Sequence, residues 1–142
     1  MTETTITKTI YIAASRETVW AYLTDKDKLG EWFHPAGDDL AVGEEYRLRR
    51  AGDDGIEKDM CWGKVLEMDR PARMVWAFSL KPLNGAMTTV TWTLKQLEGG
   101  TQLTMVHEGI GEALGSDAFG VLAMLDHGWD LHFASFRDAA KA

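Results

Sequence analysis

Two segments of the chain alternate large apolar side chains with small or polar ones, and this alternation restricts the fold more than any other feature. The segments are MVWAFSL (74–80) and TTVTWTL (88–94). Because successive side chains of a β-strand point to opposite faces, each segment would present one apolar face and one face that tolerates water. The apolar faces carry Met74, Trp76, Phe78 and Leu80 in the first segment and Val90, Trp92 and Leu94 in the second.

Further strands are predicted on both sides of this pair. Turn-forming residues separate the candidates: GDDG at 52–55, Arg70-Pro71 and Gly99-Gly100. Short turns between alternating segments are typical of hairpins, so we expect a mostly antiparallel sheet. The additional strands are ITKTIYI (6–12), EYRLRR (45–50), DMCWGKVLEM (59–68) and TQLTMVHEG (101–109).

Helices are expected at both ends of the chain. Ser15 is placed to cap a helix through RETVWAYL, and a second short helix covers 26–32. The longest candidate starts at 116 or 117 and ends near 140. At about 100° per residue, its apolar positions form one stripe centred on Trp129. These elements predict an α+β fold in which a curved antiparallel sheet wraps around a long C-terminal helix, with two short N-terminal helices. The stripe contains Ala118, Leu122, Leu125, Phe133, Phe136 and Ala140.

Size and charge narrow the possible partners. The 142 residues correspond to one domain, 1–142, and the formal net charge is −7. This charge argues against nucleic acid and anionic membranes as partners. No run of eighteen apolar residues and no signal peptide is visible, and Cys61 is the only cysteine. We therefore expect a cytoplasmic protein without disulfides or membrane insertion.

Several stretches, taken in order, resemble the small START-like (SRPBCC) domains related to the activator of heat-shock chaperone ATPase. They are IYIAASRETVWAYLTDKDKLGEWFHP (10–35), GKVLEMDRPARMVWAF (63–78), VTWTLKQLEGGTQLTMVHEG (90–109) and Gly128-Trp129. The resemblance implies a helix-grip fold, often with an apolar cavity between sheet and helix. It leaves the activity open, because this fold carries ligand binders, enzymes and co-chaperones. The chaperone activators carry an Asn- and Trp-rich activating segment. The 142 residues contain no such segment, which argues against a chaperone partner.

The six tryptophans raise the question of whether the centre of the fold is filled or hollow. Large aromatics usually fill a core, but aromatic walls with few polar groups also build small-molecule sites. Both interpretations stay open. The candidate ligand-binding residues are Trp32, Phe33, Tyr46, Trp62, Trp76, Phe78, Trp92, Met105, His107, Leu122, Asp126, Trp129 and Phe133.

Two polar residues stand out among these candidates. Strand parity points His107 toward the helix, and Asp126 lies at the border of the helical stripe, roughly 60° from its centre. The two could form a structural hydrogen bond or orient a ligand, or Asp126 could face water. Gly128, costly inside a helix by roughly 1 kcal/mol, is expected to permit close approach of a neighbouring segment.

Metal binding, nucleophilic catalysis and phosphate binding have little support in the sequence. His107-Glu108 lacks the second histidine of HExxH, His127 and His132 are separated by roughly 140° around a helix, and His34 beside two aspartates is a weak metal motif. No nucleophile elbow and no phosphate loop occurs. We therefore expect no metal and no cofactor.

The leading hypothesis is binding of a small hydrophobic or aromatic molecule in a cavity. The first alternative is a cyclase, dehydratase or hydrolase acting on such a ligand, and the second is a co-chaperone-like interaction domain. The glycine-rich stretch 109–115 could gate the cavity, and a patch around Met124 and Leu131 could support a homodimer.

Overall fold

A six-stranded antiparallel sheet is the framework of the protein. The computed structural model describes residues 5–83 and 85–140. The strand order is β1-β6-β5-β4-β3-β2, so β1 and β2 are the edges. The predicted α+β class and strand positions are confirmed. The strands are β1 (Ile6–Ile12), β2 (Glu45–Ala51), β3 (Glu57–Asp69), β4 (Arg73–Ser79), β5 (Thr88–Leu97) and β6 (Gly100–Glu108).

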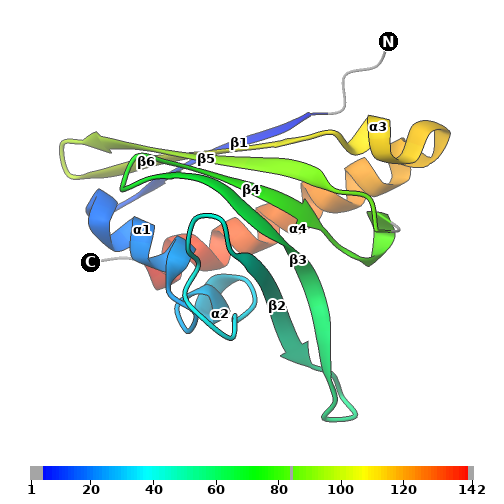
Figure 1. The fold of residues 1–142 in the computed structure, drawn as a ribbon. Helices are drawn as coiled ribbons and strands as arrows, with labels where there is room; N and C mark the ends of the chain where they lie inside the picture. Colours follow the sequence, from blue (N-terminus) through cyan, green and yellow to red (C-terminus); the bar gives the residue numbers. More distant parts are fainter. Residues whose placement is uncertain (1–4, 84, 141–142) are drawn as a thin grey trace.

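The helices lie where the sequence patterns predict them. α1 (Arg16–Thr24) begins after Ser15, whose hydroxyl accepts a hydrogen bond from the Thr18 amide as its N-cap. The second predicted helix is shorter than expected, since only α2 (Leu29–Trp32) is helical. α4 (Ala118–Ala139) crosses the concave side of the sheet, with α1 and α2 near its C-terminal end (Figure 1). The fold is the helix-grip arrangement.

The glycine-rich stretch before α4 is more regular than the expected connection. It forms α3 (Ile110–Leu114) and a 3₁₀ turn (Gly115–Asp117), and the side chain of Ile110 is fully buried. A buried anchor fixes one end of this stretch, but its mobility stays a prediction. No helix in residues 5–83 or 85–140 has the length and apolarity needed to cross a bilayer.

The curvature of the sheet depends on Gly63 in β3. A Cβ built at this position would lie 1.8 Å from the carbonyl oxygen of Ala77 on β4, and 3.0 Å from the Tyr46 hydroxyl on β2. No side chain fits such a gap, so glycine lets the three strands approach here. Register shifts on both sides of Gly63, at Leu48/Arg49 and Val65/Glu67, bend the strands further.

Aromatic rings fill the space between the sheet and α4. Trp92 at the centre meets Trp76 at 5.1 Å, Trp129 at 5.8 Å and Trp32 at 5.9 Å between ring centroids. The contacts are edge-to-face, the geometry that aromatic quadrupoles favour. The interpretation that the tryptophans fill the core therefore describes the centre of the molecule. The stripe on α4 is buried as predicted at Ala118, Leu125, Trp129, Phe133, Phe136 and Ala140, with Leu122 partly buried.

Candidate functional site

A small pocket opens between the sheet and α4, where α4 passes the first half of β3 and the C-terminal end of β4. Its volume is about 180 Å³. Aromatic and aliphatic side chains make up most of its wall, which is the usual character of small-molecule sites. The helix contributes Met124, Leu125, Gly128, Trp129 and His132; the strands and their ends contribute Met60, Cys61, Phe78 and Leu80; and the segment after α2 contributes Phe33 and His34.

Gly128 helps to create this pocket. A Cβ built on Gly128 would meet no atom within 4 Å, and the residue lines the pocket wall. The prediction that it permits close approach of a neighbouring segment is wrong, because the space beside it is open. The missing side chain instead leaves room between α4 and the strands.

Cys61 also lines the pocket, but its environment makes the thiol unreactive. The residue is buried, and burial raises the pKa of the thiol well above its ordinary value. It therefore stays protonated at neutral pH, and a protonated thiol is a poor nucleophile. This environment fits a structural role for Cys61.

Two imidazoles supply the polar part of the wall, and hydrogen bonds fix the tautomer of each. Arg50 donates from Nε to Nδ1 of His34 at 3.1 Å, so His34 carries its hydrogen on Nε2 when neutral. The Trp32 carbonyl lies 3.2 Å from Nδ1 of His132 and only accepts, so His132 carries its hydrogen on Nδ1. The two rings meet edge-to-face at 5.4 Å.

Both imidazoles are uncharged at neutral pH. Burial, aided by the nearby His132 and the Arg50 guanidinium, lowers the pKa of His34 to about 4. Burial also lowers the pKa of His132; its bond to the Trp32 carbonyl opposes this shift, and the Arg50 charge adds to it. The pocket therefore presents one neutral donor and one neutral acceptor rather than a charge.

His107 lies deeper, within the aromatic core, where a chain of hydrogen bonds satisfies it. The Thr88 hydroxyl donates to the Phe78 carbonyl at 2.8 Å, which leaves its oxygen to accept from His107 Nε2, also at 2.8 Å. Trp129 Nε1 donates to His107 Nδ1 at 3.2 Å. The predicted inward orientation is confirmed, but both ring nitrogens are occupied. Burial lowers the pKa of His107 to about 4, so it stays neutral.

Of the alternatives left open for Asp126, exposure to water is the one that the structure shows, and Asp126 does not pair with His107. Asp126 points away from the core, and its side chain is 54 % exposed. Its carboxylate contacts Lys8 on β1 at 2.6 Å, and Asp130 contacts the same ammonium at 2.9 Å. The stripe on α4 thus has two different borders: the one with Asp126 pairs with β1, and the one with His132 faces the pocket. A helical pattern alone does not tell these borders apart.

The other predicted site residues fall into separate places. Phe33, Phe78 and Trp129 line the pocket. Trp62 does not point inward, because it shares the outer face of β3 with Lys64, opposite Cys61 and Val65. The remaining apolar candidates belong to the core behind the pocket: Trp32, Trp76, Trp92, Met105, Phe133 and, at its margin, Leu122.

Two core tryptophans lack a polar partner. Nε1 of Trp76 and Nε1 of Trp92 are buried without a hydrogen-bond acceptor. Such groups are uncommon in folded proteins. Both indoles make edge-to-face ring contacts, a geometry that allows an N–H to point at a π face. Neither lines the pocket, so we assign them to packing.

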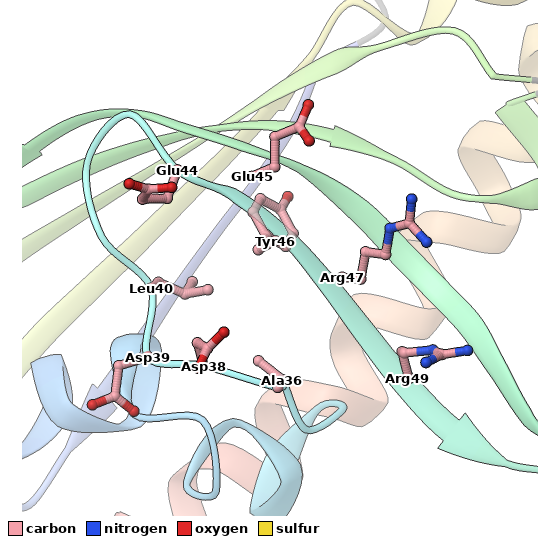
Figure 2. Close-up of a pocket in the computed structure, with 10 residues that line it drawn as sticks. Ala36, Asp38, Asp39, Leu40, Glu44, Glu45, Tyr46, Arg47 and Arg49 are labelled. Carbon is pink, nitrogen blue, oxygen red and sulfur yellow. The ribbon is translucent and has the colours of Figure 1, made fainter.

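A second, larger hollow of about 420 Å³ lies between the loop before β2 and β2 itself. Figure 2 shows polar side chains around it, including Glu44, Glu45 and Arg47. Tyr46, a predicted ligand contact, lies here, and its hydroxyl is already bound to the Ala77 carbonyl at 2.7 Å. Arg49 is paired with Asp59 at 2.9 Å. Tyr46 and Arg49 are thus already paired with groups that do not line this hollow.

Sequence reasoning missed most of the polar wall of the pocket. The sequence offers His34 and His132 only as weak metal candidates. For His132 the available signal is its place on α4, where positions 124, 125, 128, 129 and 132 follow helical spacing along one border. Residues 5–83 and 85–140 contain no group of three or more His, Cys, Asp or Glu side chains arranged for a metal ion.

Comparison of the sequence with protein families gives one match of nearly full length. The profile described as Activator of Hsp90 ATPase homolog 1-like protein matches residues 13–141. The chain belongs to this family. The predicted START-like relationship is therefore confirmed. None of the curated proteins matches the chain significantly.

Solved structures with the same fold cover nearly the whole chain. Protein MLL2253 from Mesorhizobium loti superposes with a TM-score of 0.77 at 23% identity, covering 95% of both chains. CV1439 from Chromobacterium violaceum gives 0.77 at 22% identity, covering 97% of this chain and 98% of that one. The Aha1 dimer from Colwellia psychrerythraea, solved in solution, gives 0.76 at 22% identity, covering 96% of each. At these identities the likeness shows a shared fold.

Proposed function

We propose that this protein binds a small, mostly apolar molecule in the pocket between α4 and the ends of β3 and β4. The observation that supports this most directly is the composition of the wall: aromatic and aliphatic side chains surround a space of about 180 Å³ that Gly128 leaves open. Only two neutral imidazoles interrupt the apolar surface. Such a wall favours a ligand that gains from leaving water.

The size of the pocket limits the ligand. Drug-sized sites usually span about 300–1,000 Å³, so this pocket suits roughly one ring, or one end of a longer molecule. A ring that buries on the order of 200 Å² of apolar surface gains roughly 5 kcal/mol at about 25 cal/mol per Å². The cost of association offsets much of this gain, so the expected Kd is in the millimolar range or weaker. We therefore expect weak binding of single-ring probes, and tighter binding of a natural ligand that extends beyond the pocket.

Binding is better supported than catalysis by the residues named from sequence. His107 has no free nitrogen, and Asp126 lies outside, so neither is placed to move a proton on a ligand. Any proton transfer in this pocket would depend on His34 and His132. Chaperone activation has no surface feature here that supports it beyond the family relationship.

We also propose self-association through the outer side of α4. Met124 and Leu131 are 45% and 59% exposed, as predicted. The structure from Colwellia psychrerythraea is described as a dimer. Analytical ultracentrifugation should show a concentration-dependent dimer that Leu131→Ser weakens. A monomer at tens of micromolar or more would contradict this proposal.

Paired glycine substitutions on α4 test the pocket. Gly128→Leu would place a side chain in the pocket, whereas Gly120→Leu adds the same group where no atom lies within 4 Å, at a position that does not line this pocket. We expect toluene and para-cresol to shift the indole N–H resonance of Trp129 in the wild type and in Gly120→Leu, but not in Gly128→Leu. Equal shifts in both variants, or none in the wild type, would contradict the proposed site.

A further inference from the structure

The polar part of the pocket wall has a defined pattern of donor and acceptor. His34 uses Nδ1 to accept from Arg50, and His132 uses Nδ1 to donate to the Trp32 carbonyl. Within residues 5–83 and 85–140, no protein group bonds Nε2 of either ring. At neutral pH, His34 Nε2 is therefore a donor and His132 Nε2 an acceptor.

The two rings are close enough to serve a single ligand atom. Their centroids lie 5.4 Å apart, and both residues line the pocket. Two hydrogen bonds of about 2.8 Å each span a comparable distance, so the spacing of the rings admits one oxygen atom between the two imidazoles. That atom must accept from His34 and donate to His132.

We propose that the pocket selects an uncharged hydroxyl group attached to a small apolar ring, bound between His34 and His132. This inference rests on the proposed function and specifies its ligand class. A phenolic or alcoholic oxygen has one hydrogen to donate and lone pairs to accept. It satisfies both imidazoles without changing their tautomers, while Phe33 and Trp129 enclose the ring.

Charged groups fit this pattern less well. A carboxylate only accepts, so its oxygen would face the lone pair on His132 Nε2 unless that ring took up a proton. Burial and the Arg50 guanidinium disfavour that proton. An ammonium group only donates; it would oppose the hydrogen on His34 Nε2 and be repelled by Arg50, which lies 3.1 Å from the same ring.

The Arg50 guanidinium holds this pattern in place from outside the pocket. Its second nitrogen donates to the Phe33 carbonyl at 2.6 Å, while Nε holds His34. Arg50 thus fixes the segment after α2 and the direction of the His34 ring together. Because the hydrogen-bond geometry exists before any ligand arrives, no side chain has to reorganise when a hydroxyl binds.

Four matched probes test the selection at pH 7.5: para-cresol, toluene, 4-methylanisole and 4-methylbenzoate. They share the ring and methyl group and differ in the polar end. In a titration followed by ¹H–¹⁵N NMR, para-cresol should bind about tenfold more tightly than toluene, because its hydroxyl adds two hydrogen bonds. 4-Methylanisole lacks the donor and should bind like toluene. 4-Methylbenzoate should bind no better than toluene.

Variants assign the preference to the two rings. His132→Phe and His34→Phe should each reduce the advantage of para-cresol over toluene to about twofold or less, whereas His127→Phe, on the exposed side of α4, should keep it. The wild-type comparison needs no variant, so it stands even if a variant misfolds.

The outcomes separate this inference from the proposed function. If toluene and para-cresol bind equally and both shift Trp129, the pocket binds ligands but the hydroxyl preference is wrong. Tightest binding of 4-methylbenzoate would also overturn the preference, since the site would then recognise an anion. If no probe binds at about 10 mM, the proposed function fails and this inference fails with it.

Discussion

Trp129 donates the hydrogen of its indole Nε1 to Nδ1 of His107, across 3.2 Å between α4 and β6. This bond is a polar contact inside an aromatic core, and it continues through Thr88 to the Phe78 carbonyl on β4. Because a hydrogen bond has a preferred direction, it fixes the position of α4 relative to the sheet more strictly than ring packing alone. Trp129 also lines the pocket, so the same bond holds part of the pocket wall.

Replacing His107 should therefore destabilise the protein. His107→Leu leaves the Trp129 N–H without an acceptor in a buried site, at a cost of about 1–3 kcal/mol. We expect urea unfolding to show a loss of about 2–4 kcal/mol once the change of shape is included. His127→Leu, at an exposed position of α4, is the control and should change stability by less than about 0.5 kcal/mol. A small effect at His107 would mean that the hydrogen-bond chain contributes little.

His107 also predicts how stability depends on pH. Its pKa is about 4 in the folded protein and near the ordinary 6.5 in the unfolded chain. Between these values the unfolded chain binds the proton and the folded protein does not, so stability is full above pH 6.5 and falls as the pH drops toward 4. At about 1.4 kcal/mol per pKa unit, His107 accounts for roughly 3 kcal/mol of this loss. His107→Leu should lose about 2–3 kcal/mol less than the wild type between pH 7 and pH 4.5, as measured by urea unfolding at each pH. Equal acid losses in both proteins would contradict the buried neutral state.

Asp126 should matter little, in contrast to its expected role beside a ligand. Desolvation lowers the pKa of Lys8, but the hydrogen bonds and charges of Asp126 and Asp130 outweigh this and leave the pKa raised. With both carboxylates more than half exposed, Asp126→Asn should cost less than about 1 kcal/mol, since Asp130 keeps the contact. The affinity for para-cresol, measured by NMR titration, should stay within about twofold of the wild type. A clear loss of affinity would mean that the pocket extends to this border of α4.

Gly63 should tolerate no side chain. In Gly63→Ala the new Cβ would lie 1.8 Å from the Ala77 carbonyl oxygen, so β3 and β4 must separate beside the Tyr46 hydroxyl. We expect a loss of at least about 3 kcal/mol in urea unfolding. Gly120→Ala is the matched control: it lies in α4 with no atom within 4 Å, and should stabilise the protein by up to about 1 kcal/mol. Similar stability of the two variants would show that the sheet does not need the close approach at Gly63.

The fold could be predicted from sequence because its determinants are local and repetitive. Strand alternation, turn residues and the stripe around Trp129 each depend on neighbours along the chain, and each agrees with the same two-layer arrangement. The inward direction of His107 follows from strand parity alone and is confirmed by its full burial. Parity also predicts the outward position of Trp62, once Cys61 is taken as the inward residue of the same strand.

The candidate site was harder to predict because it depends on what lies opposite each border of the helix. Asp126 and His132 are both border residues of one stripe, and only the sheet decides that Lys8 meets the first while open space meets the second. Gly128 shows the same limit. A glycine in a helix indicates either close contact or empty space, and these opposite outcomes have the same sequence pattern.

The packing of the tryptophans has an optical consequence. Trp92 contacts Trp76, Trp32 and Trp129, so the four indoles form one cluster with ring centroids 5.1–5.9 Å from that of Trp92. At such separations, excitation energy absorbed by one indole transfers to its neighbours before emission. Since Trp129 forms part of the pocket wall, a ligand that quenches this residue would lower the emission of the whole cluster. The protein thus contains its own fluorescent reporter of occupancy, usable without any attached dye.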